Sequence, residues 1–312
     1  MKQKMILAGG TGFIGGALAR HFTALDWEVV VLTRHSKARG DQVREVSWDG
    51  ATVGDWAREL EGAEAVVNLS GRSIDCRFTP ANRKLLRDSR IQSTQAIGHA
   101  IAQCKAPPHI WLNSSSASLY KHTFDTDMDE SGAQGATPEA KDEFLLELIH
   151  QWEEAFDSAQ TPQTRKVALR TTMVLGLSSN SVVPVLRRLT RLGLGGWMGS
   201  GRQFVSWIHI EDFCRGVAWV IAHEDLKGPV NFAAPKPLTN AEMMRLFREA
   251  FGMPFGFPAM AWMLEIGAFF LRTETGLILK SHRVVPGKLL ASGFTFRFPS
   301  FREALGNLIQ CQ

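Results

Sequence analysis

The residues whose type and spacing first suggest chemistry are glycines near the N-terminus. They are Gly9, Gly10, Gly12 and Gly15, in the sequence AGGTGFIG. The apolar run 5–8 before them predicts a strand, and residues 13–25 after them carry apolar side chains at helical spacing. Glycine inside a helix costs about 1 kcal/mol relative to alanine, so a cluster at this junction needs a physical reason.

A glycine-rich turn from a strand into a helix predicts phosphate binding. Without a Cβ in the way, backbone N–H groups approach a pyrophosphate, and the positive end of the helix dipole faces the phosphates. We expect Gly9 to make the turn, Gly12 to allow the close approach, and Gly15 to allow tight contact between helix and strand. Phe13 and Ile14, which open the helix, belong to the same predicted site. The position of the motif at the start of a β-α-β run favours dinucleotide binding over a plain structural turn.

The residue after the second predicted strand indicates which dinucleotide is bound. Proteins that bind NAD place Asp or Glu about 20 residues beyond the glycines, where it holds the ribose 2′-OH. Here the residue is Arg34, and Lys37 follows shortly after. A guanidinium pairs bidentately with a 2′-phosphate, whereas a carboxylate would repel it. The sequence therefore predicts NADP(H) rather than NAD(H); the alternative is a solvated arginine in a loop.

Apolar and amphipathic runs alternate along most of the chain. The predicted strands are residues 5–8, 28–33, 43–48, 63–71, 109–116, 165–170 and 228–234. The predicted helices are residues 13–25, 80–104, 138–159, 211–223, 240–251 and 259–271, with a last one after Pro299. This alternation predicts an α/β fold: a Rossmann doubly wound parallel sheet with a smaller, mostly helical C-terminal lobe.

Two regions are expected from this pattern. Residues 1–235 would form the NADP-binding domain, with residues 177–204 contributing to the substrate lobe, and residues 236–312 would form a small C-terminal domain.

The composition excludes several classes of protein. A chain of 312 residues with 45% hydrophobic and 21% charged residues is typical of a globular protein. The net charge of +4 comes from scattered basic residues, so we expect no nucleic-acid partner. The four cysteines show no CxxC spacing, which indicates reduced thiols and no metal site. We find no signal peptide, and the apolar stretch 255–270 is too short to span a bilayer, so we expect a cytoplasmic protein without a membrane partner.

Longer motifs resemble a known superfamily. The segments AGGTGFIG, SSSASLYK and FVSWIHIEDF together resemble the extended short-chain dehydrogenases/reductases. The segments RFTPANRKLLRDSRIQST, RLGLGGWMGSGRQ and VVPGKLLASGFTFRFPS narrow the resemblance to an atypical branch. Its members are labelled nucleoside-diphosphate-sugar epimerases, some with an older label as SulA-like cell-division inhibitors, and they end in a domain of unknown function. The label follows fold similarity, so it implies the fold more firmly than the reaction.

The resemblance implies further cofactor contacts, at Thr33, Asp49, Leu69, Ser70, Gly71, Arg90 and Val174. Residues 69–71 would lie beside the adenosine ribose and pyrophosphate, Asp49 near the adenine, and the backbone of Val174 beside the nicotinamide. Arg90 stands where most extended members have Asn, which suggests an additional phosphate contact. The alternative for Arg90 is a structural ion pair, for example with Asp88.

The catalytic pair of the superfamily is missing. Its members use Tyr-x-x-x-Lys on the helix after the fifth strand, where the lysine lowers the pKa of the tyrosine. Here Phe144 and Leu148 occupy those places, and Tyr120 is the single tyrosine. The remaining catalytic candidates are Ser116, where the superfamily holds a substrate-orienting hydroxyl, and Tyr120. The alternative for Tyr120 is a packing role in its loop.

Two functions are therefore open. One is an NADP-dependent epimerase or oxidoreductase with an unusual proton donor, acting on a small molecule such as a nucleotide sugar or a carbonyl compound. The other is a non-catalytic, NADP(H)-responsive regulator or cell-division-related binding protein.

Four large apolar residues are expected either to line an apolar substrate pocket or to pack in the core: Trp197, Met198, Trp207 and Trp262. A homodimer is possible, because dimers are common in the superfamily.

Overall fold

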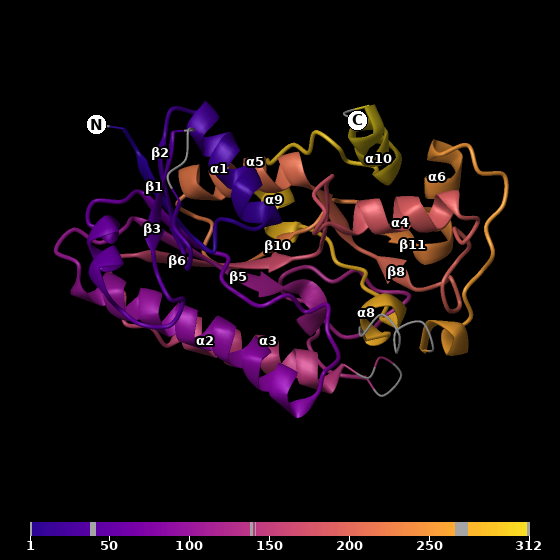
Figure 1. Ribbon diagram of the computed structural model, residues 1–312, viewed down its shortest axis with the longest axis horizontal. Coiled ribbons are helices and arrows are strands. Elements are labelled where there is room, and N and C mark those ends of the chain that lie inside the picture. The colour runs from indigo at the N-terminus through magenta and orange to yellow at the C-terminus, as the bar shows by residue number, and fades with distance from the viewer. Residues whose placement is uncertain (1, 38–41, 138–139, 141, 266–273, 311–312) are drawn as a thin grey trace.

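A seven-stranded parallel sheet forms the centre of the molecule in the computed structural model (Figure 1). The structure describes residues 2–37, 42–137, 140, 142–265 and 274–310. The strands are β1 (Lys4–Ala8), β2 (Glu28–Thr33), β3 (Val43–Ser47), β4 (Ala65–Asn68), β5 (Ile110–Ser116), β6 (Arg165–Thr171) and β10 (Gly228–Phe232). Their order is β10-β6-β5-β4-β1-β2-β3, and each neighbouring pair is parallel.

Helices cover both faces of this sheet (Figure 1). The helices α1 (Phe13–Ala24) and α5 (Ile210–Ala222) lie on one face, and α2 (Pro80–Gln103) and α3 (Glu143–Asp157) lie on the other. Successive residues of a strand point to opposite faces, so Leu7 packs with Leu18 of α1, whereas Ile6 packs with Ile97 of α2. Burial on both faces explains why the strands read as continuous apolar runs.

The lobe at the other end of the molecule has its own apolar core. It contains α4 (Val182–Arg191), α6 (Asn240–Ala250), α10 (Phe301–Gln310), and the short strands β8 (Phe204–Val205) and β11 (Leu238–Thr239), which pair antiparallel. Trp207 lies in β9 (Trp207–His209), which pairs with β7 (Met173–Leu175). Its indole is fully buried, with its centroid 5.1 Å from the Phe301 ring. Trp207 is thus a core residue and does not line a pocket.

Residues 280–285, which we call the C-terminal strap, connect the C-terminal region to the sheet domain through hydrogen bonds and an ion pair. The strap follows α8 (Gly276–Leu279) and precedes α9 (Gly287–Ala291). The Met128 N–H donates to the Arg283 carbonyl at 2.8 Å, and the Val285 N–H donates to the Met128 carbonyl at 3.0 Å. The Lys280 ammonium pairs with the carboxylate of Asp142, and both side chains are buried. Further along, Leu289 and Phe294 pack into the core of the sheet domain.

The predicted fold class is confirmed, and the differences are local. Helix α3 begins at Glu143, because the buried Asp142 occupies the N-cap position, while residues 138, 139 and 141 of the predicted helix lie outside the described residues. Of the helix predicted at 259–271, residues 261–265 are helical and residues 266–271 lie outside the described part. The short strands β7, β8, β9 and β11 were not predicted, because two or three residues carry no readable period. The domain boundary at residue 235 stays a prediction.

Candidate active site

The glycine turn joins β1 to α1 at the carboxyl edge of the sheet. Gly9 has φ +71°, a conformation that favours glycine, and a Cβ there would lie 3.0 Å from the backbone of Leu69 and Ser70. Gly12 is the N-cap of α1, and no side chain caps this helix end. A Cβ on Gly12 would meet nothing closer than 3.8 Å, so this part of the turn faces open space. The first N–H groups of α1 are therefore accessible to an anion.

Gly15 serves a different contact from the one that the sequence suggested. A Cβ on Gly15 would lie 2.5 Å from the Cα of Gly10, so the helix packs directly on the glycine turn rather than on a strand. Gly10 is itself enclosed, because its own Cβ would lie 2.9 Å from side-chain atoms of Leu7 and Val31. The glycines thus fix the turn tightly against both the helix and the sheet.

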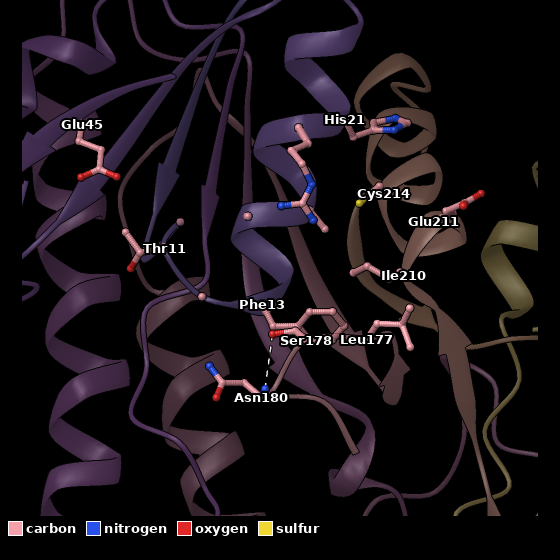
Figure 2. A pocket seen from close by; sticks show the side chains of 15 residues that line it. Thr11, Phe13, His21, Glu45, Leu177, Ser178, Asn180, Ile210, Glu211 and Cys214 are labelled. Atoms are coloured by element: carbon pink, nitrogen blue, oxygen red, sulfur yellow. Dashed lines mark hydrogen bonds between the residues drawn. The ribbon is translucent and has the colours of Figure 1, made fainter. Parts of the chain in front are cut away.

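A cavity of about 750 Å³ opens at this turn. Figure 2 shows Phe13 near its lower end beside Ser178 and Asn180 of the loop after β7, with Thr11 to one side. From there the cavity follows α1 along its flank towards His21. The Phe13 ring is held in place by Gly176, where a Cβ would lie 2.5 Å from the ring. The end of the cavity at the glycine turn lies beside the uncapped N-terminus of α1.

The ends of β2 and β3 carry the residues predicted for the adenosine side. Thr33 ends β2 and is half-buried, while the Arg34 side chain is exposed and forms no ion pair with any described residue. Asp49 follows β3, and its carboxylate accepts hydrogen bonds from the hydroxyl and N–H of Thr52 and the N–H of Ala51. These bonds lower the pKa of Asp49. The Asp49 carboxylate is thus hydrogen-bonded within its own turn. A contact between Asp49 and adenine stays a prediction.

A buried polar network, which the sequence did not indicate, supports the end of β4. The Asn68 amide donates to Asn113 at 2.8 Å, and its carbonyl oxygen accepts from the Ser70 N–H at 3.0 Å. The Thr94 hydroxyl joins the network and accepts from the Trp152 indole at 3.1 Å. This network holds Leu69, Ser70 and Gly71 beside the glycine turn. The signal that could have revealed it is an asparagine in each of two apolar strands, Asn68 at the end of β4 and Asn113 within β5.

Arg90 lies on α2 and faces the loop after β4. Its guanidinium donates to the carbonyls of Leu86 and Arg72, both at 3.1 Å, and lies 5.2 Å from the centroid of the Trp152 ring. A Cβ on Gly71 would be 3.4 Å from its Cζ. No carboxylate among the described residues forms an ion pair with the Arg90 guanidinium. Asp88, the partner considered from the sequence, pairs with Lys84 instead. Burial lowers the pKa of Arg90 to about 10.

The two predicted catalytic residues, Ser116 and Tyr120, have different surroundings in the structure. Ser116 is the last residue of β5, half-buried, and its hydroxyl oxygen accepts from the Ser118 N–H at 3.2 Å. Tyr120 is buried, and its hydroxyl donates to Asn231 at 2.8 Å and accepts from Arg170 at 3.0 Å. Burial raises the pKa of Tyr120, against the direction that a general base needs. The geometry favours the packing role for Tyr120, and its catalytic role stays a prediction.

Arg170 and the residues at the places of the missing catalytic pair also have structural partners. Arg170 forms a bidentate pair with Glu153 of α3, at 2.9 and 2.8 Å. On α3, Phe144 and Leu148 are buried in an apolar cluster, so the places of the missing pair hold packing residues. Val174 lies in β7, opposite Ile208. Among the described residues, no group of three or more His, Cys, Asp or Glu side chains could hold a metal ion.

The comparisons with known proteins agree with this geometry. Residues 5–233 match the NAD dependent epimerase/dehydratase family, and residues 261–308 match a domain of unknown function, DUF1731. The epimerase family protein SDR39U1 of Bos taurus is 33% identical over 98% of this chain and 100% of its own length. The epimerase family protein Mb2239 of Mycobacterium bovis is 34% identical over 96% of this chain and 95% of its own length.

A solved structure extends the likeness to three dimensions. The crystal structure of human SDR39U1, isoform 2, with NADPH superposes with a TM-score of 0.86 at 29% identity, covering 99% of this chain and 100% of that one. The chain therefore belongs to the NAD dependent epimerase/dehydratase family and is an NAD(P)-binding, epimerase-like protein.

Proposed function

We propose that the chain binds NADP(H) at the carboxyl edge of the sheet and uses it in oxidoreductase or epimerase chemistry on a small molecule. The observation that carries this proposal is Arg90, a half-buried cation beside Gly71 without an acidic partner among the described residues. A buried charge is costly unless an opposite charge compensates it. The diphosphate of a dinucleotide at the glycine turn would supply that charge, and the uncapped N-terminus of α1 would bind the same group.

The preference for the phosphorylated dinucleotide rests on Arg34. Strand β2 ends at Thr33 without a carboxylate, and the exposed Arg34 side chain is free to pair with a 2′-phosphate. The human relative with NADPH supports the same preference. The remaining predicted contacts, at Asp49, Ser70 and Val174, belong to this proposal.

Bound NADP(H) would supply a hydride donor or acceptor. Of the chain's own groups, the Ser116 hydroxyl lies at the end of β5, where it would orient an oxygen of the substrate. We propose a carbonyl compound or a nucleotide sugar as the substrate class. Because Phe144 and Leu148 cannot transfer protons and Tyr120 is held by Arg170 and Asn231, the proton must move by a different route from that of the superfamily.

A second candidate function is a non-catalytic NADP(H)-responsive regulator. The observation that favours it is the buried, doubly bonded hydroxyl of Tyr120, which removes the single phenol from proton transfer. Both functions share the same cofactor site, so they differ only in turnover.

The proposal is tested by fluorescence titration with NADPH and NADH. We expect NADPH to bind more tightly, and Arg34→Ala to weaken NADPH about tenfold while leaving NADH unchanged, because a hydrogen bond to a charged group contributes about 1.5–3 kcal/mol. Arg58→Ala, at an exposed arginine in the 3-10 helix Asp55–Leu60 that follows β3, is the matched control. Oxidation of NADPH with a panel of carbonyl compounds and nucleotide sugars then separates the two functions. Saturable binding without turnover identifies the regulator, and no saturable binding refutes both.

A further inference from the structure

Several large apolar side chains are exposed on the segments that follow α4 and α6. These two helices lie at the end of the molecule remote from β1 (Figure 1). We call these side chains the apolar end patch: Leu192, Leu194, Trp197, Phe255, Phe257 and Trp262. The exposed fractions reach 66% for Phe257, 65% for Trp262 and 64% for Leu192. Single exposed apolar residues need no explanation, but several on two segments that pair with each other indicate an interaction site.

The patch is built on a hydrogen-bonded scaffold. Its two segments pair through their backbones: the Phe257 N–H donates to the Gly193 carbonyl at 2.8 Å, and the Ala259 N–H donates to the Trp197 carbonyl at 2.9 Å. A Cβ on Gly196 would collide with the backbone of Phe257, so only glycine allows this approach. The rings of Phe255 and Phe257 lie edge to face at 5.7 Å. The exposed side chains are therefore held in a defined arrangement.

The surroundings of the patch are positively charged. The sequence has no Asp or Glu at residues 158–210 or 250–264, which include both segments of the patch. Arg188 and Arg191 are exposed on α4, directly before Leu192. On the adjacent α6, the carboxylate of Glu249 is paired with Arg245 and with Arg302 of α10. No carboxylate among the described residues forms an ion pair with Arg188 or Arg191. An apolar surface with such a positively charged border is complementary to a negatively charged apolar surface.

We propose that the apolar end patch docks on an anionic lipid surface, with its rings and aliphatic side chains at the headgroup boundary and Arg188 and Arg191 on the headgroup phosphates. Tryptophan and phenylalanine are favoured at that boundary, and each arginine near an anionic membrane adds to the attraction. A second copy of the chain fits less well, because a two-fold interface would place the arginine borders opposite each other.

Docking of this kind is peripheral. No helix among the described residues is long and apolar enough to cross a membrane, and none is needed for attachment through side chains at the surface. The proposal revises the expectation from the sequence that the protein has no membrane partner. It is independent of the proposed function, because the glycine turn at the start of α1 lies away from this end (Figure 1).

The proposal is tested by co-sedimentation of the full chain with vesicles of phosphatidylcholine containing phosphatidylglycerol, and with vesicles of phosphatidylcholine alone. We expect binding to the anionic vesicles that weakens at high salt. The double variant Phe257→Ser/Trp262→Ser should reduce the partition coefficient at least about tenfold. The double variant Arg188→Gln/Arg191→Gln should reduce it about fivefold for each arginine removed. Leu25→Ser, at an exposed leucine after α1, is the matched control and should bind like the wild type.

Thermal unfolding and NADPH titration of each variant establish that it is folded, and light scattering measures the mass of the free protein. Absence of binding by the wild type, or equal binding by the Phe257→Ser/Trp262→Ser variant, would overturn the proposal. A dimeric wild type that becomes monomeric in that variant, without vesicle binding, would assign the patch to self-association and overturn the lipid assignment as well.

Discussion

Replacing Arg90 by methionine tests whether this arginine binds the cofactor or only stabilises the fold. In the free protein, burial lowers the pKa of Arg90 from 12.5 to about 10, which corresponds to at most about 3 kcal/mol of unfavourable free energy for the charged form. The substitution removes this cost, and it also removes two hydrogen bonds to the carbonyls of Leu86 and Arg72, of about 1 kcal/mol each. We therefore expect the free energy of unfolding of the free protein to change by less than about 1 kcal/mol.

The affinity for NADPH should respond very differently. A charge-assisted hydrogen bond to a phosphate contributes about 1.5–3 kcal/mol, so Arg90→Met should weaken NADPH binding about 10- to 100-fold. Denaturant unfolding and fluorescence titration measure the two quantities on the same samples. Arg87→Met is the control, because Arg87 lies on the same helix and forms a surface pair with Glu147. A marked loss of stability with unchanged NADPH affinity would show that Arg90 is structural and refute the reasoning.

Three further predictions concern packing, the tyrosine and pH. Gly15→Ala should destabilise the protein by about 1–3 kcal/mol and weaken NADPH binding, because the new Cβ would overlap Gly10; urea unfolding and titration measure this. Tyr120→Phe should destabilise by about 1–3 kcal/mol, because the buried Asn231 carbonyl oxygen loses its donor and Arg170 keeps only its bonds to Glu153, with NADPH affinity unchanged. Burial lowers the pKa of His209 to about 4, so as the pH falls from about 6.5 towards 4 the unfolded chain takes up a proton that the folded chain does not. Stability should therefore fall by about 2 kcal/mol between pH 7 and pH 5 through this group, and His209→Asn should remove that part of the loss.

The Gly15 and His209 predictions each have a matched control. Gly16→Ala should be neutral or stabilising, since the nearest atom to its Cβ would be an Arg20 nitrogen at 3.6 Å. His150→Asn, at an exposed position on α3, should leave the pH dependence unchanged. If Tyr120→Phe abolished turnover at unchanged stability, the packing role would be wrong. An equal pH dependence in His209→Asn and wild type would contradict the assignment to His209.

The sequence predicted the sheet because its signal is local. Runs such as residues 5–8 and 28–33 are apolar since helices cover both faces, and this is visible without knowledge of the partners. The glycine turn was also predictable, because its conformation depends on neighbouring residues. The partner of Gly15 was not, since nothing in the sequence distinguishes packing on the turn from packing on a strand.

The role of Tyr120 shows where sequence reasoning ends. Its hydroxyl meets Arg170 and Asn231, which lie 50 and 111 residues further along the chain. The order of the strands brings these residues together, and no local pattern encodes their contact. Arg90 is the opposite case, because the unusual residue type at this position was itself the signal for a phosphate contact. The structure added that Asp88 is not its partner.

The C-terminal strap affects how the protein can be made. Its backbone completes the pairing of Met128, and its lysine neutralises Asp142 at the start of α3. On the ribosome, both of these earlier residues are synthesised well before residues 280–285. The nascent chain therefore carries an unfinished loop and an uncompensated carboxylate until residues 280–285 emerge. Folding around Met128 and Asp142 can thus finish only after those residues have left the ribosome.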